Sequence, residues 1–223
     1  HWSIDNRTIC DELNTHNVFM MASSREKMED SWRAVRYSNI VEEAEGEGKS
    51  DNGSFNFYVH RASVVDKSAA PDNCDAIMVL VPCRSLLRDG GLANLPRDQC
   101  IAGYKEMYDD EYVGKIRDAV LARLAALEGL ADLRSHIVDE VVDTPGSYAD
   151  LYNVAAGSPF ALSHGFGQLS LTRPSHRSND SDNVFFVGAS TRPGNGVPLV
   201  LIGAKQVARK VLQKISTTVQ DRR

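Results

Sequence analysis

The stretch that decides the fold is residues 184–205, VFFVGASTRPGNGVPLVLIGAK. Residues 183–189 form a continuous apolar run, which predicts a buried strand covered on both faces. A turn rich in Gly and Pro follows at residues 190–196. A helix is then predicted for residues 197–215, with Pro198 in its first turn. A strand, a tight turn and a helix in this order are typical of α/β folds.

The turn brings unshielded backbone N–H groups to the start of the predicted helix. Gly194 and Gly196 carry no side chain, and Gly188 with Ala189 lets the backbone approach a neighbouring group closely. First-turn N–H groups lack intrahelical acceptors and lie at the positive end of the helix dipole, so they favour an anionic or electron-rich ligand. A dinucleotide fingerprint is excluded because Leu199 occupies its third glycine position, and no Gly-Lys-Ser/Thr closes a P-loop. An ordinary Gly-rich turn is the alternative.

The rest of the chain mixes strands and helices. A helix is favoured by the acidic stretch at residues 24–45, and a long helix, whole or broken, by residues 96–133. In the second, apolar residues step by three and four along one stripe. We therefore expect an α/β (α+β) fold in which a mixed or antiparallel sheet lies beside the long helix. Runs rich in Val, Ile, Phe, Tyr and Met predict its strands at residues 16–22, 56–62, 76–82 and 137–143.

The amino-acid composition limits the classes of function that this chain can have. The chain has 223 residues, enough to bury a core, and its 30 acidic and 25 basic side chains give a formal charge of −5. This acidic balance argues against nucleic acid as the main partner. No apolar run reaches the roughly 20 residues that span a bilayer. The six histidines and four cysteines show no metal-ligand spacing, and we expect free thiols.

Three segments, taken in order, carry a resemblance to a known family. They are NFYVHRASVVDKSAAPDNCDAIMVLVPC (56–83), TPGSYADLYNVAAGSPFALSH (144–164) with the later Arg173-Pro174, and NVFFVGASTRPGNGVPLVLIGAKQVA (183–208). Together they resemble the carboxy-terminal half of fungal and bacterial phytoene desaturases, which are carotenoid-forming members of the flavin amine-oxidase-like superfamily. The chain departs from the family pattern at Pro159, Ala161 and Arg192, and it shows no counterpart of the family's amino-terminal G-x-G-x-x-G unit.

The resemblance implies a part of an FAD/NAD(P)-binding-type flavoprotein fold. Residues 1–143 would belong to the substrate-binding domain, residues 144–182 would line the substrate cavity, and residues 183–223 would close the FAD-binding domain. It also implies an FAD-dependent oxidoreductase acting on CH–CH groups. Such an enzyme desaturates a long polyene, phytoene, in carotenoid biosynthesis: a hydride goes to the flavin and a proton leaves the neighbouring carbon.

The resemblance also assigns roles to residues. A hydrocarbon has no polar handle, so apolar burial must bind it in a long tunnel. Two titratable residues are candidates for catalysis: His164 as a general acid or base, and Arg173 as a partner of the cofactor or of a carboxylate. A purely structural role is the alternative for each. The candidates for cofactor binding are Gly188, Ala189 and Ser190 near the ribityl and pyrophosphate groups, and Gly196, Val197 and Pro198 near the flavin pyrimidine edge. The candidates for the tunnel are Phe160, Leu162, Phe166, Leu169 and Leu171, with Gln168 nearby.

The implied partners follow from the family. They are the apolar polyene, the family's amino-terminal half in cis or in trans, and a membrane surface that an intracellular, peripheral enzyme contacts, with the basic last helix as one point of contact. Without that other half, we expect exposed apolar surface and poor solubility. Two alternatives stay open: a non-catalytic remnant or interaction module without flavin, and another flavin oxidoreductase acting on a different apolar substrate.

Overall fold

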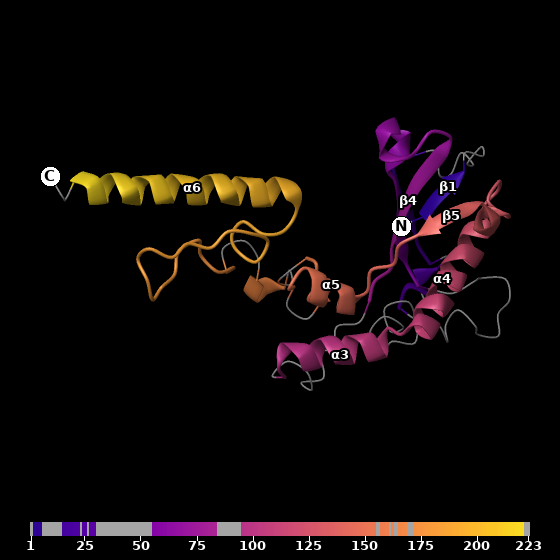
Figure 1. The fold of residues 1–223 in the computed structure, drawn as a ribbon, viewed down its shortest axis with the longest axis horizontal. Coiled ribbons are helices and arrows are strands. Elements are labelled where there is room, and N and C mark those ends of the chain that lie inside the picture. Colours follow the sequence, from indigo (N-terminus) through magenta and orange to yellow (C-terminus); the bar gives the residue numbers. More distant parts are fainter. Residues whose placement is uncertain are drawn as a thin grey trace. The chain divides into compact units, whose positions relative to one another are not determined.

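The computed structural model describes residues 2–5, 15–22, 24–25, 27–29, 55–83, 95–154, 157–160, 162, 165–168 and 172–220. The chain divides into unit 1, His1–Asp150, and unit 2, Leu151–Arg223, and each is described by itself (Figure 1). Most of the helix predicted at residues 24–45 lies outside the described residues.

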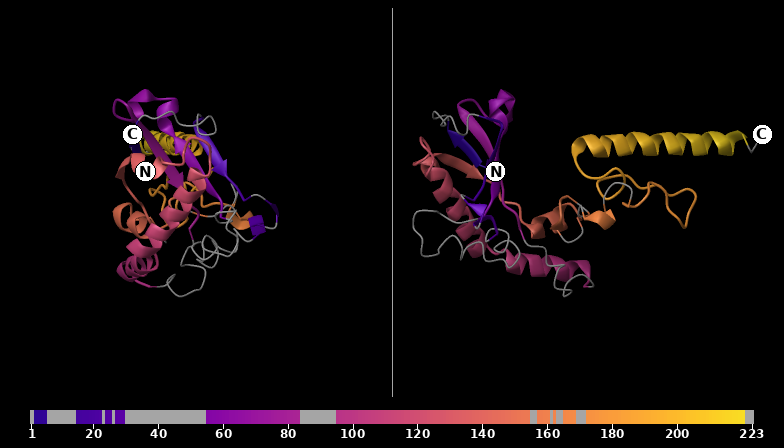
Figure 2. Two further views of the ribbon diagram at one scale, coloured as in Figure 1. Left: turned by 90° about the vertical axis from the view of Figure 1, so that its right-hand side faces the viewer. Right: turned by 180° about the vertical axis from the view of Figure 1, so that it is seen from behind.

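Unit 1 contains a five-stranded sheet with the order β2-β3-β4-β1-β5, in which every neighbouring pair is antiparallel. Figure 2 shows the ribbon from two further sides. Alternation explains β3, where Phe57, Val59 and Arg61 are buried and the residues between them are partly exposed. The four strands predicted in this unit are confirmed; three are shorter than expected, and β4 has the expected length but lies two residues earlier. The bounds are β1 Trp2–Asp5, β2 Asn17–Met20, β3 Phe57–Arg61, β4 Cys74–Leu80 and β5 Ile137–Glu140.

Two short 3₁₀ turns, η2 (Ala62–Val64) and η3 (Lys67–Ala69), connect β3 to β4. They enclose a buried polar cluster at one end of these strands. Arg61 Nη2 donates to Asp75 Oδ2 at 2.7 Å, and Ser63 Oγ donates to Asp75 Oδ1 at 2.5 Å. The cluster ties the first turn after β3 to the start of β4.

The long helix predicted at residues 96–133 is broken in two. Its halves are α3 (Arg97–Met107) and α4 (Asp110–Ala125), and η5 (Leu133–His136) follows. Asp109 is the N-cap of α4: its carboxylate accepts the backbone N–H of Tyr112 at 2.7 Å, so the second helix begins at this point. A further helix, α5 (Pro145–Leu151), begins where the sequence had indicated only a strand end.

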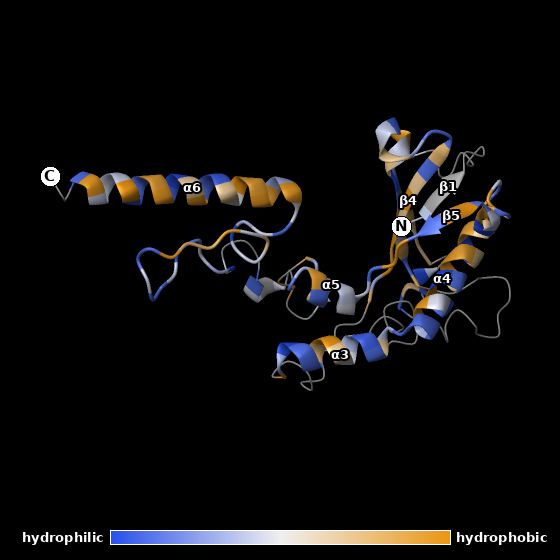
Figure 3. Ribbon diagram, viewed as in Figure 1, coloured by the Kyte–Doolittle hydropathy of each residue, from blue (hydrophilic) through white to orange (hydrophobic). Residues whose placement is uncertain are grey.

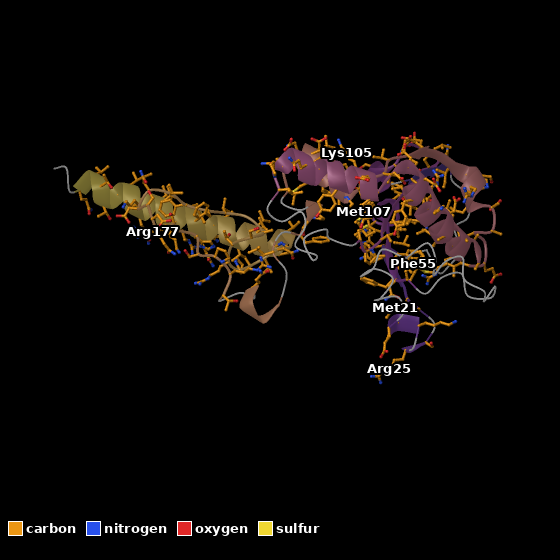
Figure 4. All side chains as sticks on the ribbon, turned by 90° about the horizontal axis from the view of Figure 1, so that it is seen from below. Met21, Arg25, Phe55, Lys105, Met107 and Arg177 are labelled. Atoms are coloured by element: carbon orange, nitrogen blue, oxygen red, sulfur yellow. The ribbon has the colours of Figure 1, made fainter. Side chains whose placement is uncertain are left out.

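The core of unit 1 lies between α4 and the sheet. Val120, Leu121 and Leu124 of α4 join a buried cluster that includes Val59 and Ile77 of the sheet. The expectation that a long helix lies beside the sheet is therefore confirmed. The guanidinium of Arg123 lies over the ring of Phe55, 5.5 Å from its centroid, at the edge of this core, and Phe55 is labelled in Figure 4.

Unit 2 carries the longest helix, α6 (Val197–Gln220), preceded by η7 (Phe166–Gln168) and loops. The predicted helix at 197–215 is confirmed and continues to Gln220. Figure 3 shows hydrophobic and hydrophilic residues interleaved along α6, as expected of an amphipathic helix. In the described part of the chain, no helix combines the length and the apolar composition that crossing a bilayer requires.

The prediction of a buried strand at residues 183–189 is wrong. Within this run only Phe185 forms a bridge, to Arg177, and Val184, Phe186 and Val187 are 42–56% exposed. A strand is buried only when other strands lie beside it and other elements cover its faces. Among the described residues, Arg177 alone supplies a strand-like neighbour, so the apolar run stays an extended, exposed segment.

Candidate functional site

The turn before α6 exposes its backbone at two glycines. Gly188, Gly194 and Gly196 have φ values of +130°, +136° and +104°, which favour glycine. A Cβ atom added at Gly188 or Gly196 would meet no heavy atom within 4 Å, so another group can approach the main chain there. At Gly194 the same atom would lie 3.3 Å from Arg173 Nε. Gly194 is therefore needed for packing, and the other two leave an open surface.

The start of α6 is equally accessible. The carbonyl of Gly196 accepts the N–H of Val200 at 2.9 Å, which closes the first helical turn. Val197 is 75% exposed and Pro198 is also exposed. First-turn N–H groups point away from the helix at its positive end. The chemistry of this donor set suits an electron-rich group that lies against Gly196 and Val197.

Arg173 links the turn to the loop before it. Its side chain is 1% exposed, and its two terminal nitrogens donate to different carbonyls: Nη1 to Ala189 at 2.7 Å and Nη2 to Leu162 at 2.9 Å. The planar guanidinium has the fork geometry that two such bonds require. Three residues that the sequence singled out, Leu162, Arg173 and Ala189, are thus brought together.

A second set of contacts, which sequence reasoning missed, lies behind the turn. His176 is 3% exposed, and its Nε2 donates to the carbonyl of Arg192. Arg192 Nε donates in turn to the carbonyl of Arg173 at 2.9 Å, and the N–H of Arg192 donates to Pro174 at 3.2 Å. A Cβ on Gly203 of α6 would lie only 3.1 Å from the Arg192 oxygen. The scattered histidines gave no signal that His176 would be buried here.

The other predicted site residues are placed as follows. Phe160 is 61% exposed, and its carbonyl accepts Asn195 Nδ2 at 3.3 Å, so its loop lies against the turn. Leu162 and Gln168 are partly buried and Ser190 is exposed. His164, Leu169 and Leu171 lie outside the described residues, as does the side chain of Phe166. The described residues contain no group of His, Cys, Asp and Glu arranged to hold a metal ion.

The residues at the turn leave room for the flavin cofactor that the sequence implied. The observation behind this is the open main chain at Gly188 and Gly196, where an added Cβ atom would meet no heavy atom within 4 Å. The residues that would hold such a group are Gly188, Ala189, Ser190, Gly196, Val197 and Pro198. Ala189 contributes a fixed backbone position, because its carbonyl is already bonded to Arg173.

Comparison with known proteins identifies the relatives. No family model matches the chain. Over 214 residues, 96% of the chain, it is 35% identical to the phytoene desaturase of Neurospora crassa and covers 31% of that protein. The chain is homologous to part of the phytoene desaturases. The phytoene desaturase of Fusarium fujikuroi is 32% identical over 96% of the chain, which covers 35% of that relative.

Bacterial relatives extend the same result. The 4,4'-diapophytoene desaturase (4,4'-diaponeurosporene-forming) of Staphylococcus aureus is 31% identical over 95% of the chain. The chain covers 36% of that protein, so it spans about a third of the length of these curated desaturases. The resemblance to phytoene desaturases drawn from the sequence motifs is therefore confirmed.

Proposed function

We propose that this chain is part of an FAD-dependent oxidoreductase that desaturates C–C bonds of a long polyene, phytoene or a related carotenoid precursor. The observation that carries the proposal is the similarity of 95–96% of the chain to proteins named phytoene or diapophytoene desaturases. Since the chain spans about a third of those relatives, the activity belongs to the larger protein, and this chain supplies part of the site.

The site supports a flavin in this role. When bound, FAD supplies the acceptor for the hydrogen removed from the hydrocarbon. The N–H groups at the start of α6, around Val197, would stabilise negative charge on the edge that they face, because they are fixed in place before the reaction. Gly188 and Gly196 let that edge come close to the main chain.

Apolar burial would hold the substrate. Phe160 and Leu162 lie on the loop that Asn195 and Arg173 tie to the turn, so they stand next to the proposed flavin surface. The 61% exposed ring of Phe160 offers apolar area to a hydrocarbon, which gains about 25 cal/mol per Å² buried. His164 stays a predicted acid or base. Arg173 stays a predicted catalytic group, although two of its nitrogens already serve backbone carbonyls.

The Val197→Glu variant tests the flavin site. A carboxylate at Val197 places negative charge against the same N–H groups, so retained FAD should fall at least about tenfold. The same charge stabilises a helix start by roughly 0.3–1 kcal/mol, so folding should not suffer. The measurement is the visible absorption of the purified chain after incubation with FAD and dialysis.

Val219→Glu is the matched control, because Val219 is 50% exposed near the other end of α6. It should retain as much FAD as the wild type. A wild-type chain that retains no FAD would reject flavin binding by this chain alone and would make the chain a fragment or a remnant of the family. Equal retention by the wild type and Val197→Glu would reject the placement of the flavin at α6.

We also propose the remaining polypeptide of a desaturase, in cis or in trans, as the partner of α6. One stripe of the helix, at Val197, Leu201, Leu212, Ile215 and Val219, is 50–75% exposed. Contiguous exposed apolar side chains on one face of a helix often mark a contact surface. In this proposal residues 183–223 close a flavin domain, residues 1–143 belong to the substrate-binding domain, and residues 144–182 line the cavity. Contact with an intracellular membrane surface is proposed for the complete enzyme.

The double variant Leu201→Gln/Leu212→Gln tests the exposure of this stripe. Removing two exposed apolar side chains should lower the binding of an environment-sensitive dye by about twofold and reduce self-association of the chain. Dye fluorescence and light scattering measure the two effects. Gln206→Ser/Gln213→Ser, on the opposite face of α6, should change neither. A wild-type chain that is monodisperse and binds no dye would contradict the proposed partner surface.

A further inference from the structure

The described interior of unit 2 is polar. Among the described residues of this unit, the buried side chains are Arg173, His176 and Thr191, and the other buried positions are glycines. In this part of the chain, hydrogen bonds from a few side chains therefore fix the path of the turn at residues 188–196. We name Arg173, His176 and Arg192 the clasp.

We propose that the clasp positions the turn at residues 188–196 for the cofactor, and that His176 and Arg192 are positioning residues of the site. No part of the proposal requires either residue to touch the flavin. The consequence for FAD rests on the function proposed above, whereas the conformational role is tested without any flavin.

The contacts run in one continuous path. Arg173 holds the carbonyl of Ala189, at the front of the turn, at 2.7 Å from Nη1. Arg192 Nε holds the carbonyl of Arg173 at 2.9 Å. His176 Nε2 donates to the carbonyl of Arg192, and the carbonyl of His176 accepts the N–H of Phe186 at 2.8 Å. The clasp therefore holds the turn at Ala189 and Arg192, and holds the segment before it at Phe186.

Three further observations show how little freedom the path leaves. A carbonyl oxygen only accepts hydrogen bonds, so His176 Nε2 must carry a hydrogen, which fixes the role of that nitrogen. Thr191 Oγ1 and the Thr191 N–H both donate to the carbonyl of Gly188, at 2.9 and 3.1 Å. Gly203 lets α6 pack directly on the Arg192 oxygen that His176 holds. The clasp therefore holds both the glycine-containing turn and the part of α6 that packs on it.

Backbone amide exchange of the whole chain, without flavin, tests the clasp. His176→Leu removes the donor and should raise exchange of the Thr191 and Arg192 amides in the turn about tenfold, because the Arg192 carbonyl loses the side chain that holds it. His176→Gln is the conservative variant, since the Gln side-chain amide also carries an N–H donor. It should bring exchange back to within about threefold of the wild type.

Arg173→Lys tests the other end of the clasp. It should raise exchange in the turn, because a single ammonium lacks the planar fork that reaches two carbonyls. In all variants, exchange in β3 and β4 of unit 1 should stay unchanged. Unchanged exchange of the Thr191 and Arg192 amides in His176→Leu, or a Gln variant no better than the Leu variant, would overturn the proposal. A uniform rise along all of α6 would also overturn it, since that indicates general unfolding.

FAD titration of the same three variants separates the two proposals. If the wild-type chain binds FAD, its dissociation constant should rise about tenfold in His176→Leu and recover in His176→Gln. If the wild-type chain binds no FAD, the flavin proposal for this chain fails, whereas the exchange result still decides whether the clasp sets the turn.

Discussion

Replacing Asp75 with alanine is expected to destabilise unit 1 by about 3–5 kcal/mol, because it leaves a buried charge without its partner. Asp75 is 3% exposed and Arg61 is 8% exposed, and their 2.7 Å contact is joined by Ser63 at 2.5 Å. Urea unfolding followed by tryptophan fluorescence measures the loss, since Trp2 and Trp32 both belong to unit 1.

Two variants make this test specific. Asp72→Ala, at an exposed position two residues before β4, should change the urea midpoint little. The double variant Arg61→Met/Asp75→Leu replaces the pair by apolar side chains and should recover most of the stability, because no buried charge is left. A single Asp75→Ala variant as stable as the wild type would show that Arg61 finds another partner.

The ion pair between Arg61 and Asp75 makes the stability of unit 1 depend on pH in the acid range. Burial by itself would raise the pKa of Asp75, but hydrogen bonds from Arg61 and Ser63, with the charges of Arg61 and Lys67, bring that pKa below its ordinary value. The stabilisation is thus complete above the unfolded pKa of about 3.9 and is lost as the pH falls from there through the lower, folded pKa. The urea midpoint of Asp75→Ala should therefore depend less on pH below about 4 than that of the wild type.

Replacing Leu124 with alanine is expected to cost about 3–5 kcal/mol through the cavity that it opens. Leu124 is fully buried in α4 and belongs to one cluster with Phe55 and Val59. Alanine is the better helix former, so the loss cannot come from helix propensity and measures packing against the sheet. Urea unfolding should show a lower midpoint with the same slope.

Leu124→Met is the matched control, since it nearly conserves volume and should cost less than about 1.5 kcal/mol. Ala126→Ser, at an exposed position at the end of α4, should be close to neutral. If Leu124→Ala and Leu124→Met were equally stable, the packing of α4 on β3 and β4 would have to be looser than the structure shows.

Periodic segments were predictable and short ones were not. The alternation in β3 and the three- and four-residue steps of α4 each repeat often enough to identify an element. Strand β1 has four residues, and its place depends on pairing with β4 and β5, whose residues lie 69 or more positions away in the sequence. The break before α4 depends on a cap at Asp109, which a hydrophobic pattern does not report.

In the candidate site, too, some features could be predicted from the sequence and others could not. The Gly-rich turn and its helix were predictable, because Gly188, Gly194 and Gly196 mark positions with positive φ. The apolar run before the turn was misread, since a continuous run predicts burial only where neighbouring strands exist. His176 was missed because its role depends on the carbonyl of Arg192, and a contact between a side chain and a distant backbone atom leaves no pattern in the sequence.

The polar interior of unit 2 also shapes its response to temperature. Unfolding raises the heat capacity when apolar surface enters water and lowers it when polar surface does. Arg173, His176 and Thr191 occupy the interior where unit 1 has Phe55, Leu124 and Ile77. Per residue, the free energy of unfolding of unit 2 should therefore curve less with temperature than that of unit 1.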